Sequence, residues 1–324
     1  MRQVEPVTAT PVHYSERFVE ALRPCKPGAW LQDELQRADK IMSCEAVVLQ
    51  RYLDIRGRRL LDFGCGAGAS TVAWGRLGAL VTGVEPDAQL AQAAALRVVE
   101  DGLDQTARVL HVPDTRHLPF PDGAFEICVC NAVMEHIAPR ERGGYVREIW
   151  RVLQPGGYLY VTETPNRLWP YDGHTTHLWC VPWMPLGLAR RYAIWRGRVE
   201  PDKSAADLVA MGMRGATYWE IAGALHGQPF AVVRPRGKDE IEGSVDLVRP
   251  QSAPRRALKR GYVAWFRLLD RTFCRWTGIP VAALLPDLTF CLQKLPRPSG
   301  AVRPHLSGAV RPHLSGAGQG SDGR

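Results

Sequence analysis

Between residues 58 and 165, short apolar runs alternate with helical patterns, and few folds can accommodate this alternation. Strands that alternate with helices at this spacing indicate βαβ units and a parallel sheet. The apolar runs predict five strands, over 58–64, 79–86, 107–113, 125–133 and 158–165. The helical patterns between them cover 70–78, 87–103 and 139–157, and the last one is stopped by Pro155 and the glycine pair that follows it.

The flanking segments are less regular. Four prolines among residues 1–29 indicate a loose N-terminal arm over 1–30, and 31–53 has helical spacing. After residue 165 we expect a lid over 166–215, a helix over 216–227, strands over 230–235 and 288–295, and an inserted cap over 239–285. The main domain would thus span 31–296. The tail 297–324 repeats SGAVRPHL and is too poor in large apolar residues to fold, so it is predicted to be disordered.

A glycine-rich turn follows the first predicted strand. In LLDFGCGAGAS, residues 60–70, the strand ends near Asp62, and Gly64, Gly66 and Gly68 lead into a helix. Glycines let the backbone pass close to a ligand, and a helix N-terminus presents free N–H groups to polar atoms. Glu85 lies 21 residues after Gly64 at the tip of the second strand, where a carboxylate suits a ribose diol. The pattern indicates a nucleoside cofactor, but it also satisfies the dinucleotide-binding fingerprint of dehydrogenases, so both cofactor classes remain open at this point.

Four stretches taken together narrow that choice: LLDFGCGAG, VTGVEPD, DTRHLPFPDGAFEICVCNAVMEHI at 114–137, and REIWRVLQPGGYLYVTETPN at 147–166. They resemble the class I S-adenosylmethionine-dependent methyltransferases, especially the small-molecule branch often called methyltransferase type 11. The resemblance covers roughly residues 55–170 and implies a Rossmann-like α/β fold. Its seven-stranded sheet would be mostly parallel with an antiparallel last edge. With helices on both faces and the inserted helical cap, this completes the fold class that we expect.

The resemblance also implies residue roles. Asp62 and the turn of Gly64, Cys65, Gly66 and Gly68 would meet the methionine portion of S-adenosylmethionine. The other positions would bind the ribose (Glu85, beside Pro86), the adenine amino group (Asp114, beside Thr115) and the region near the methionine end (Asn131).

The base that would deprotonate a methyl acceptor is sought after the fourth and fifth strands, because ligands bind there in open α/β sheets. Glu135 and His136 follow the fourth strand, and they could instead orient the local turn. Asp172, His174 and His177 follow the fifth, where they could act on the acceptor or only make structural hydrogen bonds. The His-x-x-His pair has no apparent further ligands, so no metal site is predicted.

The positive charge lies in the C-terminal half. The net charge is +8, and it divides into −3 for residues 1–179 and +11 for 180–324. Residues 254–278 form a basic amphipathic pattern that suits either a cap over the site or contact with a membrane surface.

We expect a cytoplasmic enzyme, because the sequence shows neither a secretory signal nor an apolar run of bilayer length, and its basic amphipathic segment would allow peripheral contact with a membrane. The predicted function is methyl transfer to a small molecule. An RNA or protein acceptor is the first alternative, although no nucleic-acid-binding module is recognisable. A nicotinamide-dependent oxidoreductase is the second.

Overall fold

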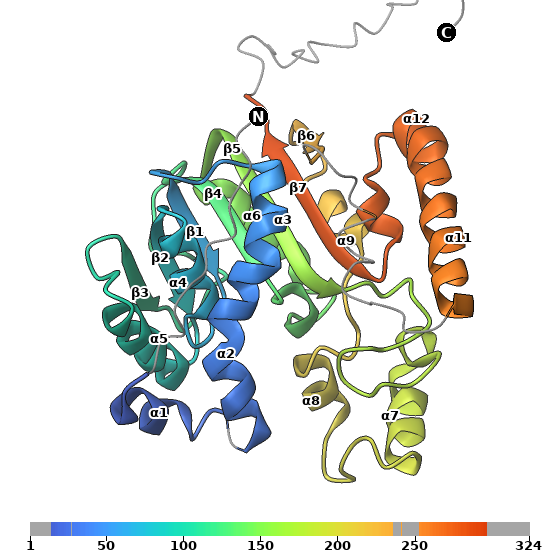
Figure 1. Cartoon of the computed structure of the whole chain (residues 1–324), viewed down its shortest axis with the longest axis horizontal. Coiled ribbons are helices and arrows are strands. Elements are labelled where there is room, and N and C mark those ends of the chain that lie inside the picture. Colours follow the sequence, from blue (N-terminus) through green and yellow to red (C-terminus); the bar gives the residue numbers. More distant parts are fainter. Residues whose placement is uncertain (1–13, 27, 236–240, 242–252, 297–324) are drawn as a thin grey trace, which may run out of the picture.

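The computed structural model describes residues 14–26, 28–235, 241 and 253–296. Its centre is a seven-stranded sheet with the spatial order β3-β2-β1-β4-β5-β7-β6 (Figure 1). The strands are β1 (Arg59–Phe63), β2 (Leu80–Glu85), β3 (Ala107–His111), β4 (Phe125–Asn131), β5 (Leu153–Pro165), β6 (Phe230–Val233) and β7 (Asp287–Lys294). The predicted fold class is confirmed.

The antiparallel edge has a specific arrangement. β7 lies between β5 and β6 and pairs antiparallel with both of them, whereas the other paired strands run parallel. The reversal therefore belongs to β7 alone.

Helices cover both faces of the sheet. On one face, α2 (Ala29–Ser43), α3 (Glu45–Tyr52), α4 (Ala69–Arg76) and α5 (Ala88–Glu100) share a buried core with the strands. On the other face, α6 (Arg142–Val152) and α9 (Tyr218–Ala224) form a second core.

Successive side chains along a strand point alternately into these two cores. Cys128 and Cys130 pack into the core of α6 and α9, as the sequence spacing predicts for residues two apart, while Ile127 and Val129 pack into the opposite core. Because both faces are buried, the middle of β4, residues 127–130, is a continuous apolar run rather than an alternating one.

The N-terminal prediction needs correction. Residues 14–26 are not a loose arm, because α1 (Glu16–Leu22) begins at a Ser15 cap and buries Phe18 and Leu22 completely. These side chains share a small core with α5, and Arg97 of α5 forms a buried ion pair with Glu34 of α2. Residues 1–13 of the predicted arm lie outside the described residues.

The helical pattern over 31–53 also forms differently from the prediction. It is two helices, because the chain turns at Cys44 between α2 and α3. Both still pack on the same core of the sheet.

The lid, residues 166–215, lies below the carboxyl ends of the strands in Figure 1 and has its own apolar core. It contains a short 3₁₀ helix (Val181–Trp183), α7 (Leu186–Trp195) and α8 (Ala205–Ala210).

The predicted cap lies elsewhere. Its described part comprises α11 (Ala253–Leu269), a π-helical turn (Asp270–Cys274), α12 (Arg275–Thr277) and a 3₁₀ helix (Val281–Leu284). α11 and α12 stand beside the β6–β7 edge, on the opposite side of the molecule from α1 and α5 (Figure 1). The predicted disordered tail, 297–324, lies outside the described residues. Within the part of the chain that the structure describes, none of the helices combines the length and the hydropathy that crossing a bilayer requires.

Candidate active site

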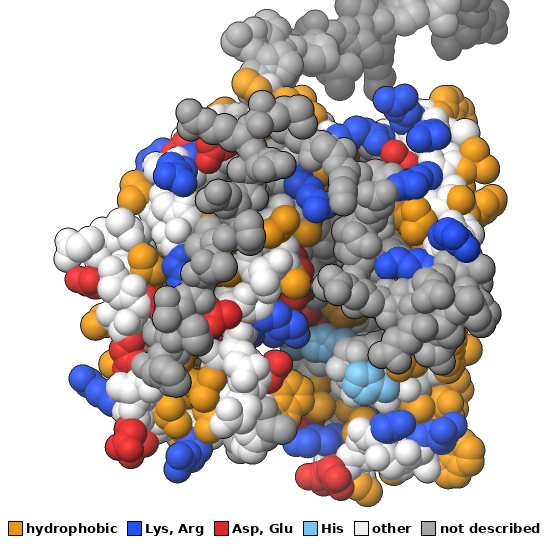
Figure 2. Space-filling view, viewed as in Figure 1, with side chains coloured by type: hydrophobic (Ala, Val, Ile, Leu, Met, Phe, Trp, Pro, Cys, Tyr) orange, Lys and Arg blue, Asp and Glu red, His pale blue; other side chains and the backbone are white. Residues whose placement is uncertain are grey.

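A cavity of about 1300 Å³ opens at the carboxyl ends of the parallel strands. Its walls come from the turn after β1, the tips of β2 and β4, α2, and the lid. Figure 2 shows histidine side chains near the centre of this face, beside apolar side chains. A volume above the usual 300–1,000 Å³ of ligand pockets leaves room for a nucleoside cofactor and a second molecule together.

The glycine turn forms the first wall. Gly64, Gly66 and Gly68 all have positive φ angles, of 72°, 55° and 81°, which other residues adopt rarely. The N–H groups of Gly64 and Cys65 donate to the Val84 carbonyl, so the turn is fastened to β2. No atom lies within 4 Å of the position that a Cβ of Gly66 would occupy, so a ligand can approach this backbone closely.

Asp62 supports this turn from behind. Its Oδ2 accepts hydrogen bonds from the hydroxyls of Ser70 and Thr71, both at 2.7 Å, and the side chain is buried outside the lining of the cavity. Burial raises the pKa of Asp62 to about 6, and the two hydroxyls oppose this rise. Asp62 thus fixes the start of α4, while Gly64, Cys65 and Gly66 form the wall itself.

Glu85 is the acid of the cavity. Its Oε2 accepts from the N–H of Gly66 at 2.9 Å, and its Oε1 accepts from that of Asp87 at 3.1 Å. Each carboxylate oxygen keeps a lone pair for another donor. Burial raises the pKa of Glu85, and the two backbone donors counteract it. The carboxylate is therefore oriented before any ligand binds, and Pro86 lines the cavity next to it.

Of the two residues predicted to lie at the adenine, only Thr115 lines the cavity. Thr115 is buried and lines the cavity, whereas the Asp114 carboxylate is 46% exposed and lies outside the lining. Arg116 donates to both Asp114 oxygens, and these hydrogen bonds lower the Asp114 pKa to about 2. A role for Asp114 toward adenine stays a prediction.

Asn131, at the end of β4, carries an unused donor. Its side chain is buried and lines the cavity, and its Nδ2 has no hydrogen-bond partner. A buried amide without a partner is unfavourable, so this group suits a polar ligand atom. With the open glycine turn and the oriented Glu85 carboxylate, the donor set fits S-adenosylmethionine.

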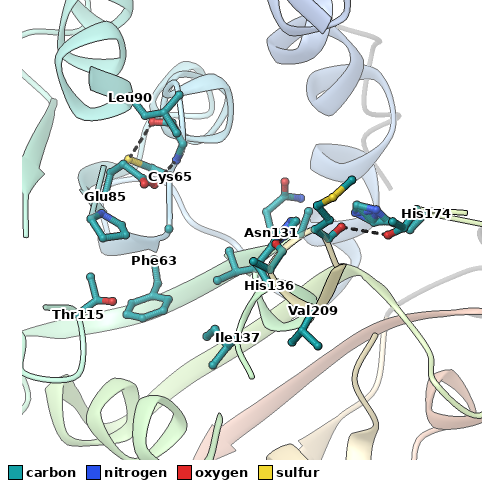
Figure 3. Close-up of a pocket in the computed structure, with 18 of the residues that line it drawn as sticks. Phe63, Cys65, Glu85, Leu90, Thr115, Asn131, His136, Ile137, His174 and Val209 are labelled. Atoms are coloured by element: carbon teal, nitrogen blue, oxygen red, sulfur yellow. Dashed lines mark hydrogen bonds between the residues drawn. The ribbon is translucent and has the colours of Figure 1, made fainter. Parts of the chain in front are cut away.

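A second polar group lies at the other end of the cavity. Figure 3 shows Glu85, Cys65 and Thr115 on one side, and Asn131, His136 and His174 on the other. Glu135 Oε1 lies 3.9 Å from His136 Nε2 and 3.6 Å from His174 Nε2. A short 3₁₀ helix (Met134–His136) after β4 supplies Glu135 and His136, and the lid supplies His174.

Burial changes the charge of this group. It raises the pKa of Glu135 to about 8, although hydrogen bonds to the Glu135 carboxyl group lower this pKa in part. It lowers the pKa of His136 and of His174 below the usual value. Both imidazoles are thus neutral near pH 7, with lone pairs available in the cavity.

The other two predicted catalytic residues differ from each other. His177 lines the cavity. Asp172 does not, because its carboxylate accepts from the backbone N–H groups of His174, Thr175 and Thr176 and from the Thr176 hydroxyl. Asp172 therefore holds the loop that carries His174 and is fully occupied in doing so.

Sequence patterns missed several lining residues. Lys26, Trp30 and Arg37 come from the segment before β1, and Val209 and Met211 come from around α8. Their separation from the strand ends along the chain gives no signal for them. None of residues 254–278 lines the cavity, so the predicted cap over the active site is wrong for this segment, and the lid covers the site instead.

Comparison with known proteins agrees with this geometry. Residues 61–161 match the family model described as "Methyltransferase domain". The ubiquinone biosynthesis O-methyltransferase of Psychrobacter cryohalolentis is 28% identical over 142 residues, which cover 43% of this chain and 51% of that protein. The enzyme of the same name from Xanthomonas oryzae pv. oryzae is 34% identical over 115 residues, which cover 36% and 46%.

A solved S-adenosylmethionine-dependent methyltransferase from Mesorhizobium loti is 18% identical with a TM-score of 0.44, covering 77% of this chain and 96% of that one. The chain spans about half the length of the curated relatives it matches. Residues 61–161 are thus similar to a methyltransferase domain, and S-adenosylmethionine is the cofactor that this similarity supports, as the sequence predicts.

Proposed function

We propose that this protein is an S-adenosylmethionine-dependent methyltransferase that transfers a methyl group to a hydroxyl oxygen of a small molecule. The observation that carries the proposal is one cavity with two different ends. Glu85 and the partnerless amide of Asn131 lie at the nucleoside end, and two neutral imidazoles lie at the other.

The cofactor would supply a methyl group already activated by its sulfonium centre. The chain would contribute binding, orientation and proton removal. The Glu85 carboxylate would accept from the ribose hydroxyls, and Asn131 Nδ2 would donate near the methionine end. His136 and His174 would face the acceptor, and one of these two imidazoles would receive its hydroxyl proton, while the lid would hold the acceptor in line with the transferring methyl.

The acceptor end suits a molecule with an apolar body. Ile137 and Val209 lie near His136 in Figure 3, and Met211 and Leu186 of α7 also line the cavity. The two bacterial relatives described above are named O-methyltransferases of ubiquinone biosynthesis, which supports an oxygen acceptor. We infer that the acceptor carries its hydroxyl on an aromatic or similarly flat apolar group. No feature of the described cavity favours the RNA, protein or nicotinamide alternatives over this one.

The decisive experiment supplies methyl-labelled S-adenosylmethionine and a panel of hydroxylated aromatic compounds to the purified protein. We expect label in an O-methyl product and formation of S-adenosylhomocysteine. Glu85→Gln should raise the KM for the cofactor, while His174→Ala should mainly lower kcat. The proposal is wrong if the cofactor binds but label appears only in RNA or protein.

Peripheral membrane contact is a second part of the proposal. Trp265 and Trp276, on the α11–α12 segment, are 57% and 85% exposed, and Arg260, Arg271 and Arg275 are exposed beside them. Indole rings with cationic neighbours favour the interface of an anionic bilayer. Such contact would bring the cavity to a lipophilic acceptor, and a cytoplasmic location would be compatible with it.

A further inference from the structure

Three side chains at the acceptor end could converge on one ion. Ligand atoms of Glu135, His136 and His174 all lie within 4.8 Å of one another. Two imidazole nitrogens and one carboxylate oxygen are the donors that bind divalent transition metals. The sequence alone places His174 near His177, and because no further ligand is apparent for that pair, it predicts no metal site. In the structure, Glu135 and His136 supply two further ligands, and they lie next to His174 rather than His177.

The Glu135 carboxylate has an unused oxygen. The side chain is completely buried, and Oε1 has no hydrogen-bond partner. Oε1 is also the atom that approaches both imidazoles, at 3.9 Å and 3.6 Å. Oε1 is thus a buried polar atom without a partner that faces one nitrogen of each imidazole, and a bound cation would supply that partner.

The surrounding hydrogen bonds orient the ligand atoms toward a common point. His136 Nδ1 donates to the Ala210 carbonyl at 2.7 Å, which leaves Nε2 without a proton and facing Glu135. Glu135 Oε2 accepts from the Thr164 hydroxyl at 3.2 Å, which directs Oε1 to the cavity. Such outer hydrogen bonds are the usual support of metal ligands.

The local backbone reserves space for this arrangement. Gly212 has a φ of 92°, and a Cβ there would lie 3.0 Å from Glu135 Cγ and 3.4 Å from His174 Nε2. The chain after α8 thus packs directly against two of the three side chains. Any larger residue would disturb them.

We propose that Glu135, His136 and His174 form a binding site for one divalent transition-metal ion at the acceptor end of the cavity. Imidazole ligands select ions such as zinc, iron, cobalt or nickel over magnesium and calcium, which prefer oxygen ligands. The remaining coordination positions would face the cavity, where a hydroxylated acceptor enters. Coordination there would lower the pKa of the acceptor hydroxyl, and its proton would pass to solvent water, because the two imidazoles would serve as ligands and not as the bases of the proposed function.

The ion would also join two parts of the molecule. Glu135 and His136 belong to the segment after β4, whereas His174 belongs to the lid. Metal binding should therefore hold the lid against the sheet and slow proteolytic cleavage within 166–215.

This inference concerns ion binding, which can be measured without methyl transfer. The probe is Co²⁺, added to the metal-free full-length protein and followed by its visible d–d absorption, with bound metal counted by mass spectrometry after gel filtration. We expect about one Co²⁺ per chain, displaced by Zn²⁺ and unaffected by Mg²⁺ in excess.

Matched variants assign the ligands. Glu135→Gln and His174→Ala should each weaken Co²⁺ binding by at least about tenfold, since each removes a ligand. His177→Ala is the control, because it removes a nearby histidine of the same loop that lies outside the ligand set, and it should keep the stoichiometry. Circular dichroism spectra would show that the variants fold.

Absence of bound Co²⁺ in the folded wild-type protein would overturn the proposal. So would an equal loss of binding in His177→Ala, because the ligand set would then be different. Either result leaves the methyltransferase proposal intact, since the imidazoles can still act as bases. Conversely, a protein that binds Co²⁺ but transfers no methyl group would reject the proposed function alone.

Discussion

Glu85 illustrates how one residue can serve both the fold and the site. It accepts one hydrogen bond from the glycine turn and another from the start of α5, and it still lines the cavity. Replacement by glutamine keeps the size of the side chain but removes the charge and puts an N–H₂ group opposite one of these donors.

We expect Glu85→Gln to lose about 1.5–3 kcal/mol of cofactor binding, or roughly 10–100-fold in affinity. Isothermal titration with S-adenosylhomocysteine would measure it. Glu126→Gln is the control, because Glu126 lies near the start of β4, far from the cavity. An unchanged affinity in Glu85→Gln would contradict the ribose role.

Gly68 is constrained by backbone conformation and by packing. Its φ is 81°, and a Cβ would lie 2.9 Å from the Ala94 Cβ and 3.0 Å from its Cα. Gly68→Ala should destabilise the fold by about 1–3 kcal/mol in urea unfolding, because the strained φ and the clash with α5 add. Gly144→Ala in α6 should be neutral or stabilising, since no atom lies within 4 Å there. Equal stabilities of the two variants would refute this account.

Glu45 should make stability depend on pH. Burial, and then repulsion from Glu163, raise its pKa from 4.5 to about 7. The folded state thus holds this proton more tightly than the unfolded state does, so the free energy of unfolding falls as pH rises from about 4.5 to about 7.

Glu45→Gln should remove this slope and gain about 1–3 kcal/mol relative to the wild type between pH 4.5 and pH 8. Its amide oxygen can still accept from Thr162 as the carboxylate does. Urea unfolding at the two pH values would measure the difference, with Glu20→Gln, an exposed position on α1, as the control. The same stability difference from the wild type at both pH values would exclude the effect.

At the scale of elements, the lid and the α11–α12 segment could each cover the active site as far as the sequence pattern shows, but only the lid does so in the structure. Both contain tryptophans and arginines, so composition does not separate them. Only the packing of α11 beside the β6–β7 edge, away from the cavity, leaves its indoles exposed and without an active-site role.

The double variant Trp265→Ala and Trp276→Ala should therefore lose binding to vesicles that contain anionic phosphatidylglycerol. The loss should be about tenfold or more, since each exposed indole stabilises the interface by roughly 1–2 kcal/mol. Co-sedimentation measures it, and Trp195→Ala on α7 is the exposed-tryptophan control. Folding and cofactor affinity should be unchanged in the double variant. If the wild-type protein does not bind such vesicles, the proposed membrane contact is wrong.

At the scale of the whole molecule, cofactor binding should be coupled to global stability. The site combines β1, β2, β4, α2 and the lid, so a bound cofactor must be released before these elements separate. At a hundredfold excess over Kd, S-adenosylhomocysteine should add about 2.7 kcal/mol to the free energy of unfolding. Measuring the thermal unfolding temperature with S-adenosylhomocysteine and with NAD would compare the stabilisation by the two cofactor classes. Stabilisation by NAD alone would favour the oxidoreductase alternative.

Much of this architecture could be predicted because it depends on local patterns. The five parallel strands, the glycine turn and Glu85 follow from apolar runs, glycines and a spacing that holds within one βαβ unit. The N-terminal helix was missed because its stability comes from burying Phe18 and Leu22 against α5, a contact that proline content does not report.

The sequence alone determined which residues gather at the proposed cofactor end, because the neighbouring parallel strands β2, β1 and β4 bring residues 85, 64 and 131 to the same edge of the sheet. Only the tertiary structure decided the acceptor end. Whether His174 or His177 meets Glu135, and whether 166–215 or 254–278 covers the cavity, depends on how distant segments pack. Packing sums many weak contacts between residues far apart in the chain, and no local pattern records their balance.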